Sequence, residues 1–366
     1  MKILCYNNMP SHYQEAFYKE LNKFVELEVI YENDLSDERK KLGWSSDLKG
    51  YRFQFQRGIK PTINSLIHSY DFIFLIGFPG NFYNLLSSYL YKSKRWGTYS
   101  EMPEPSDRTL IWRLASFLFA KTIKSGKCVL FGIGEQIRTY YLQLGIPDNM
   151  IFPFAYFPEP PAILSQPKFD GPIVFVGQLI ERKGIDLLIK AVSNSKFLQT
   201  KSLIVIGSGP KLQEYKELSN YLGIAESVRF LGHLRTSIVY ETIKNASCLI
   251  LPSRHEGWGA VINEAIHLGL PSIVSDVCGA SELIKNGNCG IIFDNNNAID
   301  LQKKIELLLN DYSFWKNCSE NCLSYSHKIT PSSGVRYFLE VVNYSISSNK
   351  SELEKPKAPW LNEMNE

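Results

Sequence analysis

Residues 249–265 read Leu-Ile-Leu-Pro-Ser-Arg-His-Glu-Gly-Trp-Gly-Ala-Val-Ile-Asn-Glu-Ala, which is a short apolar run, a turn with two glycines and a helical pattern. Further short runs rich in Ile, Val, Leu and Phe alternate with segments of helical period along the chain. Such runs are typical of parallel strands that are buried on both faces. The sequence therefore predicts an α/β protein with strands at residues 3–6, 27–31, 72–76, 129–131, 173–176, 202–206, 228–231, 249–251 and 272–274.

A proline-rich segment divides this alternation into two halves. Five prolines lie between residues 157 and 172, which predicts an extended linker. A chain of 366 residues is also long enough for two domains. We predict one domain at residues 1–165, a second at 166–330, a helix at 331–348 that packs back on the first domain, and a disordered tail at 349–366.

The composition is that of an ordinary globular protein, with 44% hydrophobic and 21% charged residues. The net charge of +3 is too small to indicate a nucleic-acid partner. Seven cysteines without paired spacing favour a reducing compartment. The first residues read as a strand and not as a leader, and no apolar run approaches the roughly 18 residues of a membrane span. We therefore expect a cytoplasmic protein.

The turn after residue 251 has the features of a site for an anionic sugar ligand. Gly257 and Gly259 let backbone N–H groups approach a ligand, and the start of the following helix carries partial positive charge. Glu256 and Glu264 are separated by seven residues, so the second carboxylate lies about two helical turns beyond the first, on the same side. Carboxylates accept hydrogen bonds from vicinal sugar hydroxyls. The segment therefore suits a diphosphate joined to a sugar.

This segment resembles the E-x7-E motif of glycosyltransferase family 4, whose members are retaining enzymes of GT-B fold with two Rossmann-like domains facing across a cleft. By that resemblance, Glu256 contacts hydroxyls of the transferred sugar and Glu264 contacts the ribose 2′ and 3′ hydroxyls. Residues 175–191, 203–210 and 228–232 resemble the strands and loops of the family's nucleotide-binding domain. The resemblance is strong over residues 172–293 and diffuse before them.

The resemblance also implies which residues hold the donor. Lys183 would place a cation on the β-phosphate, so Lys183 and Glu256 are the predicted catalytic residues. Family members usually carry Arg where this chain has Gln178, and the neighbouring Arg182 is a candidate to replace that charge. The alternatives are that Glu264 is a solvated helix residue and Lys183 a surface lysine. The predicted donor-binding residues are Glu264, Gly257, Trp258, Gly259, Ala260, Gly177, Gln178, Arg182, Gly207, Phe230 and Leu231.

The N-terminal half offers three candidate residues for the acceptor side. The segment 7–13, Asn-Asn-Met-Pro-Ser-His-Tyr, resembles a subgroup pattern that contains Pro-Ser-x-Tyr. By that resemblance, His12 or Tyr13 contacts the acceptor or the donor phosphate. Glu101 is a candidate for orienting the acceptor hydroxyl. Ordinary loop roles for His12 and Glu101 are equally good interpretations.

A basic segment suggests where the acceptor is found. Eight basic and three acidic residues lie between residues 92 and 127. Within it, basic residues surround an apolar pattern of helical spacing, which is typical of a helix at an anionic membrane surface. An ordinary core helix is the alternative. We hypothesise peripheral attachment to the inner face of the cytoplasmic membrane and a lipid-linked oligosaccharide acceptor. The residues concerned are Ile111, Leu114, Ala115, Leu118 and Phe119, with Arg108, Arg113, Lys121, Lys124 and Lys127 around them.

Several patterns argue against other enzyme classes. His255 and Glu256 are not followed by the second histidine of a zinc protease motif, because residue 259 is glycine. The glycine pairs at 207/209 and 132/134 do not complete the G-x-G-x-x-G pattern of a nicotinamide dehydrogenase. No Asp-x-Asp pair occurs, so we expect transfer without a metal and without a cofactor.

Together these patterns predict a retaining hexosyltransferase that uses a nucleotide diphosphate sugar, with UDP favoured over GDP. Departure of the diphosphate and attack of the acceptor would occur on one face of the sugar, while domain closure about the linker excludes water. Family expectation adds a role in cell-surface polysaccharide synthesis, such as capsule or O-antigen. A sugar-nucleotide epimerase of the same fold and an inactive nucleotide-sugar-binding subunit are the alternatives. The sugar, the linkage and the oligomeric state stay open.

Overall fold

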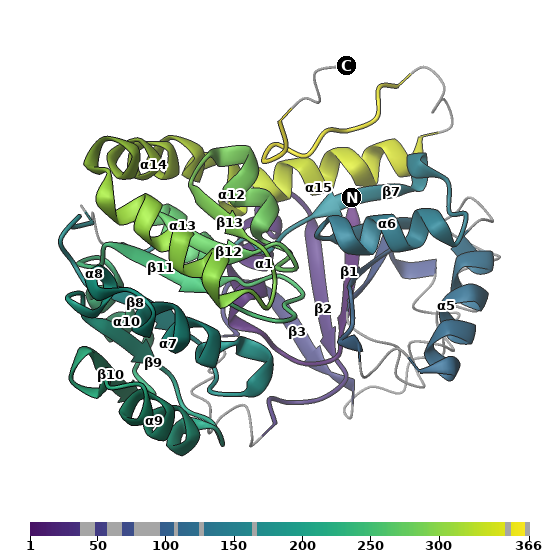
Figure 1. The fold of residues 1–366 in the computed structure, drawn as a ribbon. Coiled ribbons are helices and arrows are strands. Elements are labelled where there is room, and N and C mark those ends of the chain that lie inside the picture. The colour runs from purple at the N-terminus through teal and green to yellow at the C-terminus, as the bar shows by residue number, and fades with distance from the viewer. Residues whose placement is uncertain are drawn as a thin grey trace. The chain divides into compact units, whose positions relative to one another are not determined.

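The computed structural model describes residues 1–36, 48–56, 68–76, 96–105, 109–123, 128–162, 167–347 and 353–362 (Figure 1). The chain divides into two compact units. The first unit contains Met1–Glu159 and Thr330–Pro359, and the second contains Pro160–Ile329 and Trp360–Glu366. The chain therefore passes from one unit to the other three times.

The first unit is built on a seven-stranded sheet in the order β3-β2-β1-β4-β5-β6-β7. All its neighbouring strands are parallel. β1 pairs with β2 on one side and β4 on the other, so the direction in which strands are added reverses at β1. The strands are β1 (Lys2–Asn7), β2 (Glu26–Tyr31), β3 (Arg52–Phe55), β4 (Phe72–Ile76), β5 (Trp96–Glu101), β6 (Cys128–Ile133) and β7 (Ile151–Phe154).

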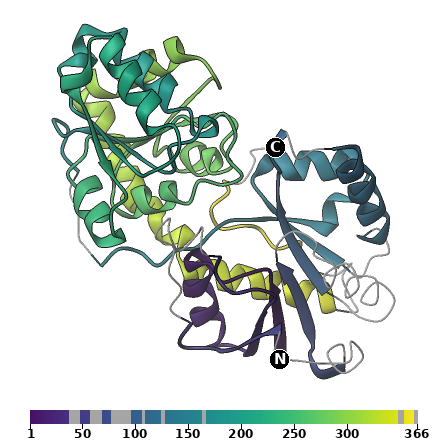
Figure 2. The ribbon, with the colours of Figure 1, turned by 90° about the horizontal axis from the view of Figure 1, so that it is seen from below.

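The described helices of this unit include one from the far end of the chain. They are α1 (His12–Leu21), α5 (Leu110–Ile123), α6 (Glu135–Gln143), η3 (Asp148–Met150) and α15 (Pro331–Ile346). In Figure 2, α15, drawn in yellow, passes behind the strands of the first unit and across them. Phe338 of α15 is fully buried, with ring centroids 5.0 Å from Phe74 and 5.5 Å from Phe17. The helix predicted at residues 331–348 is thus part of the first unit's aromatic core.

The second unit is built on a six-stranded parallel sheet in the order β10-β9-β8-β11-β12-β13. Its strands are β8 (Ile173–Val176), β9 (Leu203–Ile206), β10 (Val228–Gly232), β11 (Cys248–Leu251), β12 (Ser272–Ser275) and β13 (Gly290–Phe293). Its helices are η4 (Glu181–Lys183), α7 (Ile185–Ser193), α8 (Lys196–Gln199), α9 (Leu212–Tyr221), η5 (Ala225–Ser227), α10 (Thr236–Ile243), α11 (Val261–His267), α12 (Ser281–Gly287), α13 (Ala298–Asn310), α14 (Tyr312–Tyr325) and η6 (Ser326–Ile329).

The predicted fold class is confirmed, because each unit is a Rossmann-like domain with a parallel sheet. The nine predicted strands are all present. The structure adds β3, β5, β7 and β13. Three of these additions lack a continuous apolar run: β3 alternates polar and apolar residues, β5 contains Gly97, Thr98 and Ser100, and β7 contains Pro153, which an edge strand tolerates. The apolar-run criterion therefore missed the edge strands β3, β7 and β13 and the central strand β5.

The prediction of a disordered tail is wrong for residues 353–362. Trp360 is fully buried in the second unit, and Lys355 donates to the Asp148 carboxylate in the first unit at 2.9 Å. The composition of the tail is dominated by polar residues and prolines, which favour disorder, but a single tryptophan supplies enough apolar surface to anchor it.

No helix in the described part of the chain combines the length and the hydrophobicity that crossing a membrane would require.

Candidate functional site

The predicted donor residues gather where the strand order of the second unit reverses. β8 pairs with both β9 and β11, and the chain adds strands first on one side of β8 and then on the other. Ligands of open parallel sheets bind beyond the carboxyl ends of the strands at such a switch point. Lys183 follows β8 and Glu256 follows β11, so the topology brings these two residues to the same place.

Lys183 and Glu256 are in direct contact. The Lys183 Nζ donates a hydrogen bond to the Glu256 carboxylate, and Ser253 Oγ donates a second at 3.2 Å. Arg182 Nη1 lies 3.5 Å from the same carboxylate oxygen. The side chains of Lys183 and Glu256 are only 14% and 12% exposed, so Lys183 is not a surface lysine. The site therefore concentrates two cations around one carboxylate.

The charge state of Glu256 follows from these neighbours. Burial alone would raise the pKa of Glu256, but the charges of Lys183 and Arg182 and the hydrogen bonds from Lys183 and Ser253 outweigh it and lower the pKa. Glu256 is thus an ionised acceptor, which can bind hydroxyl groups of a ligand.

Arg254 holds the loop that carries Glu256. Its guanidinium donates two hydrogen bonds of 2.7 Å to the carboxylate of Asp186 and one of 2.9 Å to the Glu181 carbonyl. The Arg254 backbone N–H donates to the Arg182 carbonyl at 2.8 Å. Paired bonds between a guanidinium and a carboxylate fix orientation as well as distance. Arg254 could not be identified from the sequence, because its partner Asp186 is 68 residues away and only the fold brings them together.

Two glycines allow the loops of the site to pack closely. Gly184 has a φ of +67°, and a Cβ there would overlap the carbonyl oxygen of Pro252. Gly259 has a φ of +97°, and a Cβ there would come within 2.7 Å of the Leu251 side chain. A side chain at either position would therefore be strained, and at position 184 it would also push the loop after β8 away from the loop after β11.

Gly177 and Gly207 pack against each other at the ends of β8 and β9. A Cβ on Gly207 would overlap the Gly177 carbonyl oxygen. Gly177 N–H donates to the Ile206 carbonyl at 3.0 Å, and Gly207 N–H donates to the Gly232 carbonyl at 2.8 Å. Backbone packing is thus sufficient to require glycine at position 207, whatever ligand binds there.

Glu264 lies in the first turn of α11 and is buried. Burial raises the pKa of Glu264 to about 7, although a hydrogen bond from the Tyr240 hydroxyl lowers it in part. Glu264 is therefore not a solvated helix residue. Tyr240 belongs to α10 and was not identified from the sequence, which gives no local indication of this contact.

The side chain of Trp258 is part of the core below the donor loop. It is 1% exposed, and the indole N–H donates to Asn263 Oδ1 at 2.8 Å. The ring is therefore a core element that fixes the turn, and only the backbone of Trp258 is left for a ligand. The remaining predicted donor residues lie at the carboxyl ends of the strands and are partly buried: Gln178 after β8, Phe230 and Leu231 in β10, and Gly257 and Ala260 before α11.

The predicted acceptor residues lie at the equivalent switch point of the first unit. His12 and Tyr13 begin α1, which follows β1, and their rings are 3.9 Å apart. Burial lowers the pKa of His12 to about 4, so this histidine is neutral near pH 7. Glu101 is the last residue of β5.

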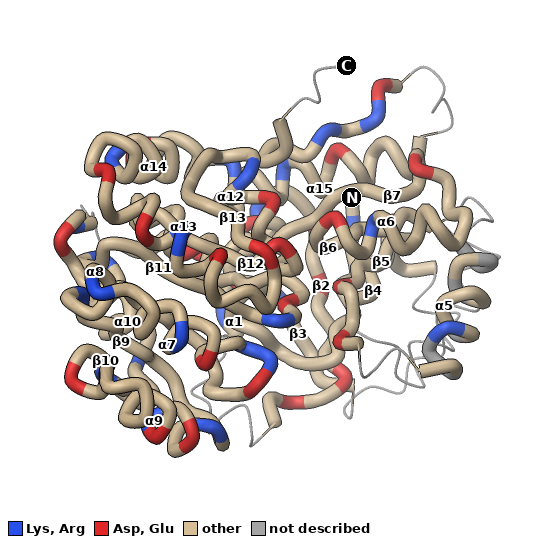
Figure 3. Tube along the Cα trace, in the orientation of Figure 1, with Lys and Arg blue, Asp and Glu red and all other residues tan. Residues whose placement is uncertain are grey.

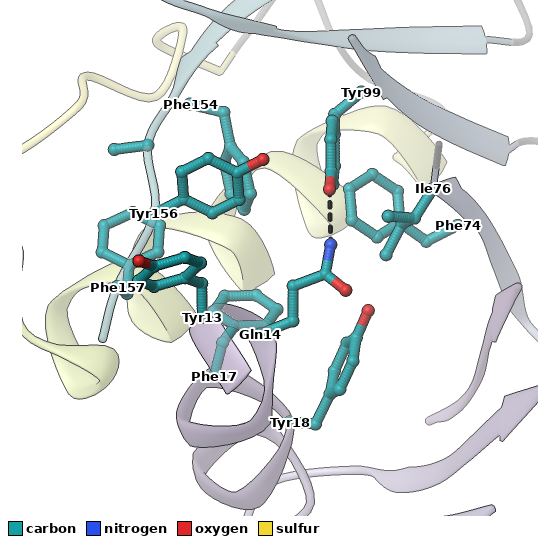
Figure 4. Close-up of a pocket in the computed structure, with 11 residues that line it drawn as sticks. Tyr13, Gln14, Phe17, Tyr18, Phe74, Ile76, Tyr99, Phe154, Tyr156 and Phe157 are labelled. Carbon is teal, nitrogen blue, oxygen red and sulfur yellow. Dashed lines mark hydrogen bonds between the residues drawn. The ribbon is translucent and has the colours of Figure 1, made fainter. Parts of the chain in front are cut away.

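Tyr156 connects these residues, although the sequence analysis did not identify it. The Tyr156 hydroxyl donates to the Glu101 carboxylate, and its ring centroid lies 5.9 Å from that of Tyr13. Both tyrosines line a pocket of the first unit that Figure 4 shows, where the amide of Gln14 donates to the Tyr99 hydroxyl. The pocket is thus mainly aromatic, with a few polar groups at fixed positions.

The helix predicted to meet a membrane is α5, and part of its side-chain pattern lies within the described residues. Leu114, Phe117 and Leu118 are between 56% and 62% exposed, and Leu110 is 73% exposed. Their spacing places them on one face of the helix. The side chains of Ile111, Ala115, Phe119 and Lys121, and all of Arg108, Lys124 and Lys127, are outside the described residues. Figure 3 shows acidic and basic residues interspersed along the other described helices.

The second unit is similar in sequence to a known protein family. The family model for glycosyl transferases group 1 matches residues 157–324. An uncharacterized glycosyltransferase of Methanocaldococcus jannaschii is 32% identical over 159 residues, which are 43% of this chain and 43% of that protein. An alpha-1,4-N-acetyl-D-galactosaminyltransferase of Campylobacter jejuni is 27% identical over 241 residues, which are 64% of this chain and 65% of that protein. The chain thus covers less than two thirds of either relative.

The fold of the whole chain also has solved counterparts. The crystal structure of HepE from Anabaena in complex with UDP matches with a TM-score of 0.74 at 15% identity, over 94% of this chain and 100% of that one. At this level of identity the match concerns the fold, which is GT-B. The residues predicted to bind the donor all lie within the segment that the family model covers. Residues 157–324 of this chain, somewhat under half of its length, therefore match the glycosyl transferases group 1 family model.

Proposed function

We propose that this chain is a retaining glycosyltransferase that moves a hexose from a nucleotide diphosphate sugar to a hydroxyl of a glycan or lipid-linked oligosaccharide. The contact between Lys183 and Glu256 at the switch point of a group 1 domain is the observation that carries the proposal. We favour UDP as the nucleotide, which the UDP complex of the structural neighbour HepE supports. The Campylobacter relative, named for an acceptor on PP-undecaprenol, supports a role in polysaccharide assembly on a lipid.

The charges of the site suit departure of a diphosphate. As the bond between the anomeric carbon and the diphosphate breaks, negative charge grows on the phosphate oxygens, and Lys183 and Arg182 would stabilise it. The acceptor oxygen would attack the anomeric carbon from the face that the diphosphate leaves, and its proton would pass to a departing phosphate oxygen. Attack on this face retains the anomeric configuration. Lys183 and Arg182 would neutralise the leaving diphosphate, so this mechanism requires no metal. Glu256, ionised and buried, would hold the hydroxyls of the sugar.

We expect Lys183→Ala to lower the initial rate of sugar transfer about 100- to 1000-fold, because one group that stabilises developing charge typically contributes that much. The rate is measured as label transferred from radioactive UDP-hexoses to extracted lipid-linked oligosaccharides. Lys196→Ala, which removes an exposed lysine of α8, is the matched control and should keep the wild-type rate.

Unchanged transfer by Lys183→Ala would contradict this mechanism. Release or epimerisation of the sugar in the absence of acceptor would instead favour the epimerase, and nucleotide-sugar binding by an inactive wild-type protein would favour the non-catalytic subunit. The anomeric configuration of the product, determined by NMR, decides between retention and inversion.

Nucleotide affinity should depend on pH through Glu264. Its pKa of about 7 in the free protein means that the carboxylate is protonated below neutral pH, whereas two ribose hydroxyls are best accepted by the ionised form. We expect UDP affinity to rise with pH up to about pH 7 and then level off, with roughly 30-fold weaker binding at pH 5.5 than at pH 8. Isothermal titration calorimetry measures this dependence.

The control for the pH experiment is Glu264→Gln, which leaves the titration of UDP itself unchanged. The difference between wild type and Glu264→Gln isolates the contribution of the carboxylate. The same pH dependence in both proteins would show that Glu264 does not contact the nucleotide.

We further propose that the protein works at the inner face of the cytoplasmic membrane and meets a lipid-linked acceptor there. The exposed apolar face of α5 supports this, since Leu114, Phe117 and Leu118 lie beside the exposed, basic Arg113. Placement of the acceptor in the first unit rests on Glu101, whose carboxylate accepts a hydrogen bond from the Tyr156 hydroxyl.

Replacing Leu114, Phe117 and Leu118 together by serine should lower binding to phosphatidylglycerol vesicles at least tenfold, because each large apolar side chain contributes about 1.5–3 kcal/mol on transfer from water. Binding is measured by co-sedimentation. The control replaces Ile299 and Leu307, exposed apolar residues of α13, by serine. Equal vesicle binding by wild type and the α5 variant would remove the membrane proposal.

A further inference from the structure

The described end of the chain is held at two points, one in each unit. In the first unit, Lys355 Nζ donates to the Asp148 carbonyl at 2.7 Å and to its carboxylate at 2.9 Å. The same ammonium lies 5.3 Å from the centre of the Phe152 ring. Four residues separate Lys355 from Trp360, where the chain enters the second unit.

Trp360 is the anchor in the second unit. Its side chain is fully buried, and the indole N–H donates to Glu282 Oε1 at 3.1 Å. The Tyr325 hydroxyl donates to the Trp360 carbonyl. Asn362 adds two hydrogen bonds of 2.9 Å to Asn286, at the other end of α12. Residues 360–362 are therefore held near both ends of α12.

The two residues before α12 are hydrogen-bonded to the loop that carries Glu256. Just before this helix, Gly279 N–H donates to the Glu256 carbonyl at 3.1 Å, and Ala280 N–H donates to the Trp258 carbonyl at 2.8 Å. A Cβ on Gly279 would overlap the Gly257 carbonyl oxygen, so the two segments pack backbone to backbone. A displacement of the start of α12 would therefore be transmitted to the loop of Glu256.

We propose that Trp360 is a positioning residue of the donor site, which acts through Glu282 and the start of α12 on the loop at residues 256–260. The proposal rests on the donor site described under Proposed function. Glu282 lies three residues after Gly279, so a bond that fixes Glu282 also limits movement of the backbone that pairs with Glu256. The residue that supports the donor loop, Trp360, thus follows a stretch of chain, Thr330–Pro359, that belongs to the first unit.

The test separates positioning from general stability. Trp360→Phe keeps a buried aromatic ring and removes the indole N–H, and Glu282→Ala removes its acceptor. Trp315→Phe is the matched control. Trp315 is also a buried tryptophan of the second unit, and its indole N–H donates a hydrogen bond of 2.6 Å to the Ser247 carbonyl. Each full-length variant is compared with the wild-type protein in two measurements, both made well below its unfolding temperature. The first is hydrogen exchange of residues 276–287, and the second is calorimetric titration with UDP.

Trp360→Phe and Glu282→Ala should each speed exchange in residues 276–287 and weaken UDP binding about five- to tenfold. The double variant should lose no more than either single variant, since both remove the same hydrogen bond. Trp315→Phe should change neither measurement.

Wild-type exchange and affinity in Trp360→Phe would overturn the proposal, and so would equal losses in Trp315→Phe, which would indicate general loosening. Failure of the wild-type protein to bind UDP or GDP would contradict the donor site itself. In that case the exchange data still decide whether Trp360 holds the loop of Glu256.

Discussion

The ion pair between Lys183 and Glu256 depends on where β8 and β11 lie in the second sheet. Their carboxyl ends adjoin because the chain reverses the direction of strand addition at β8. Two buried charges are unfavourable unless they are paired and hydrogen-bonded, and here Ser253 and Arg182 supply the additional partners. The arrangement holds a lysine and a glutamate in fixed positions before any ligand arrives.

Residues farther from the ion pair hold its two loops in place. Gly184 lets the loop after β8 lie against the loop after β11, and Arg254 ties the two together through Asp186. The start of α12 then holds the second loop from its other side, and Trp360 holds α12. Each of these contacts is short in space but long in sequence. Arg254 and Asp186 are 68 positions apart, and Trp360 and Glu282 are 78 positions apart.

This separation explains what the sequence could and could not predict. Apolar runs identified most of the buried strands but not the central β5, whose sequence mixes polar and apolar residues. The spacing of Glu256 and Glu264 identified the loop and helix that carry them. Arg254, Tyr240 and Tyr156 were missed, because nothing in their local sequence distinguishes them from surface residues until the fold supplies their partners.

The wrong prediction of a disordered tail has a similar cause. The polar composition of the tail predicts disorder, whereas buried Trp360 and the hydrogen bonds of Lys355 and Asn362 hold residues 355–362 in place. The central claim is that Lys183 and Glu264 bind one nucleotide diphosphate, and a crystal structure with UDP tests it most directly. We expect a β-phosphate oxygen within about 3.2 Å of Lys183 Nζ and the ribose hydroxyls on the Glu264 carboxylate. UDP bound elsewhere, or bound without contact to Lys183, would contradict the claim.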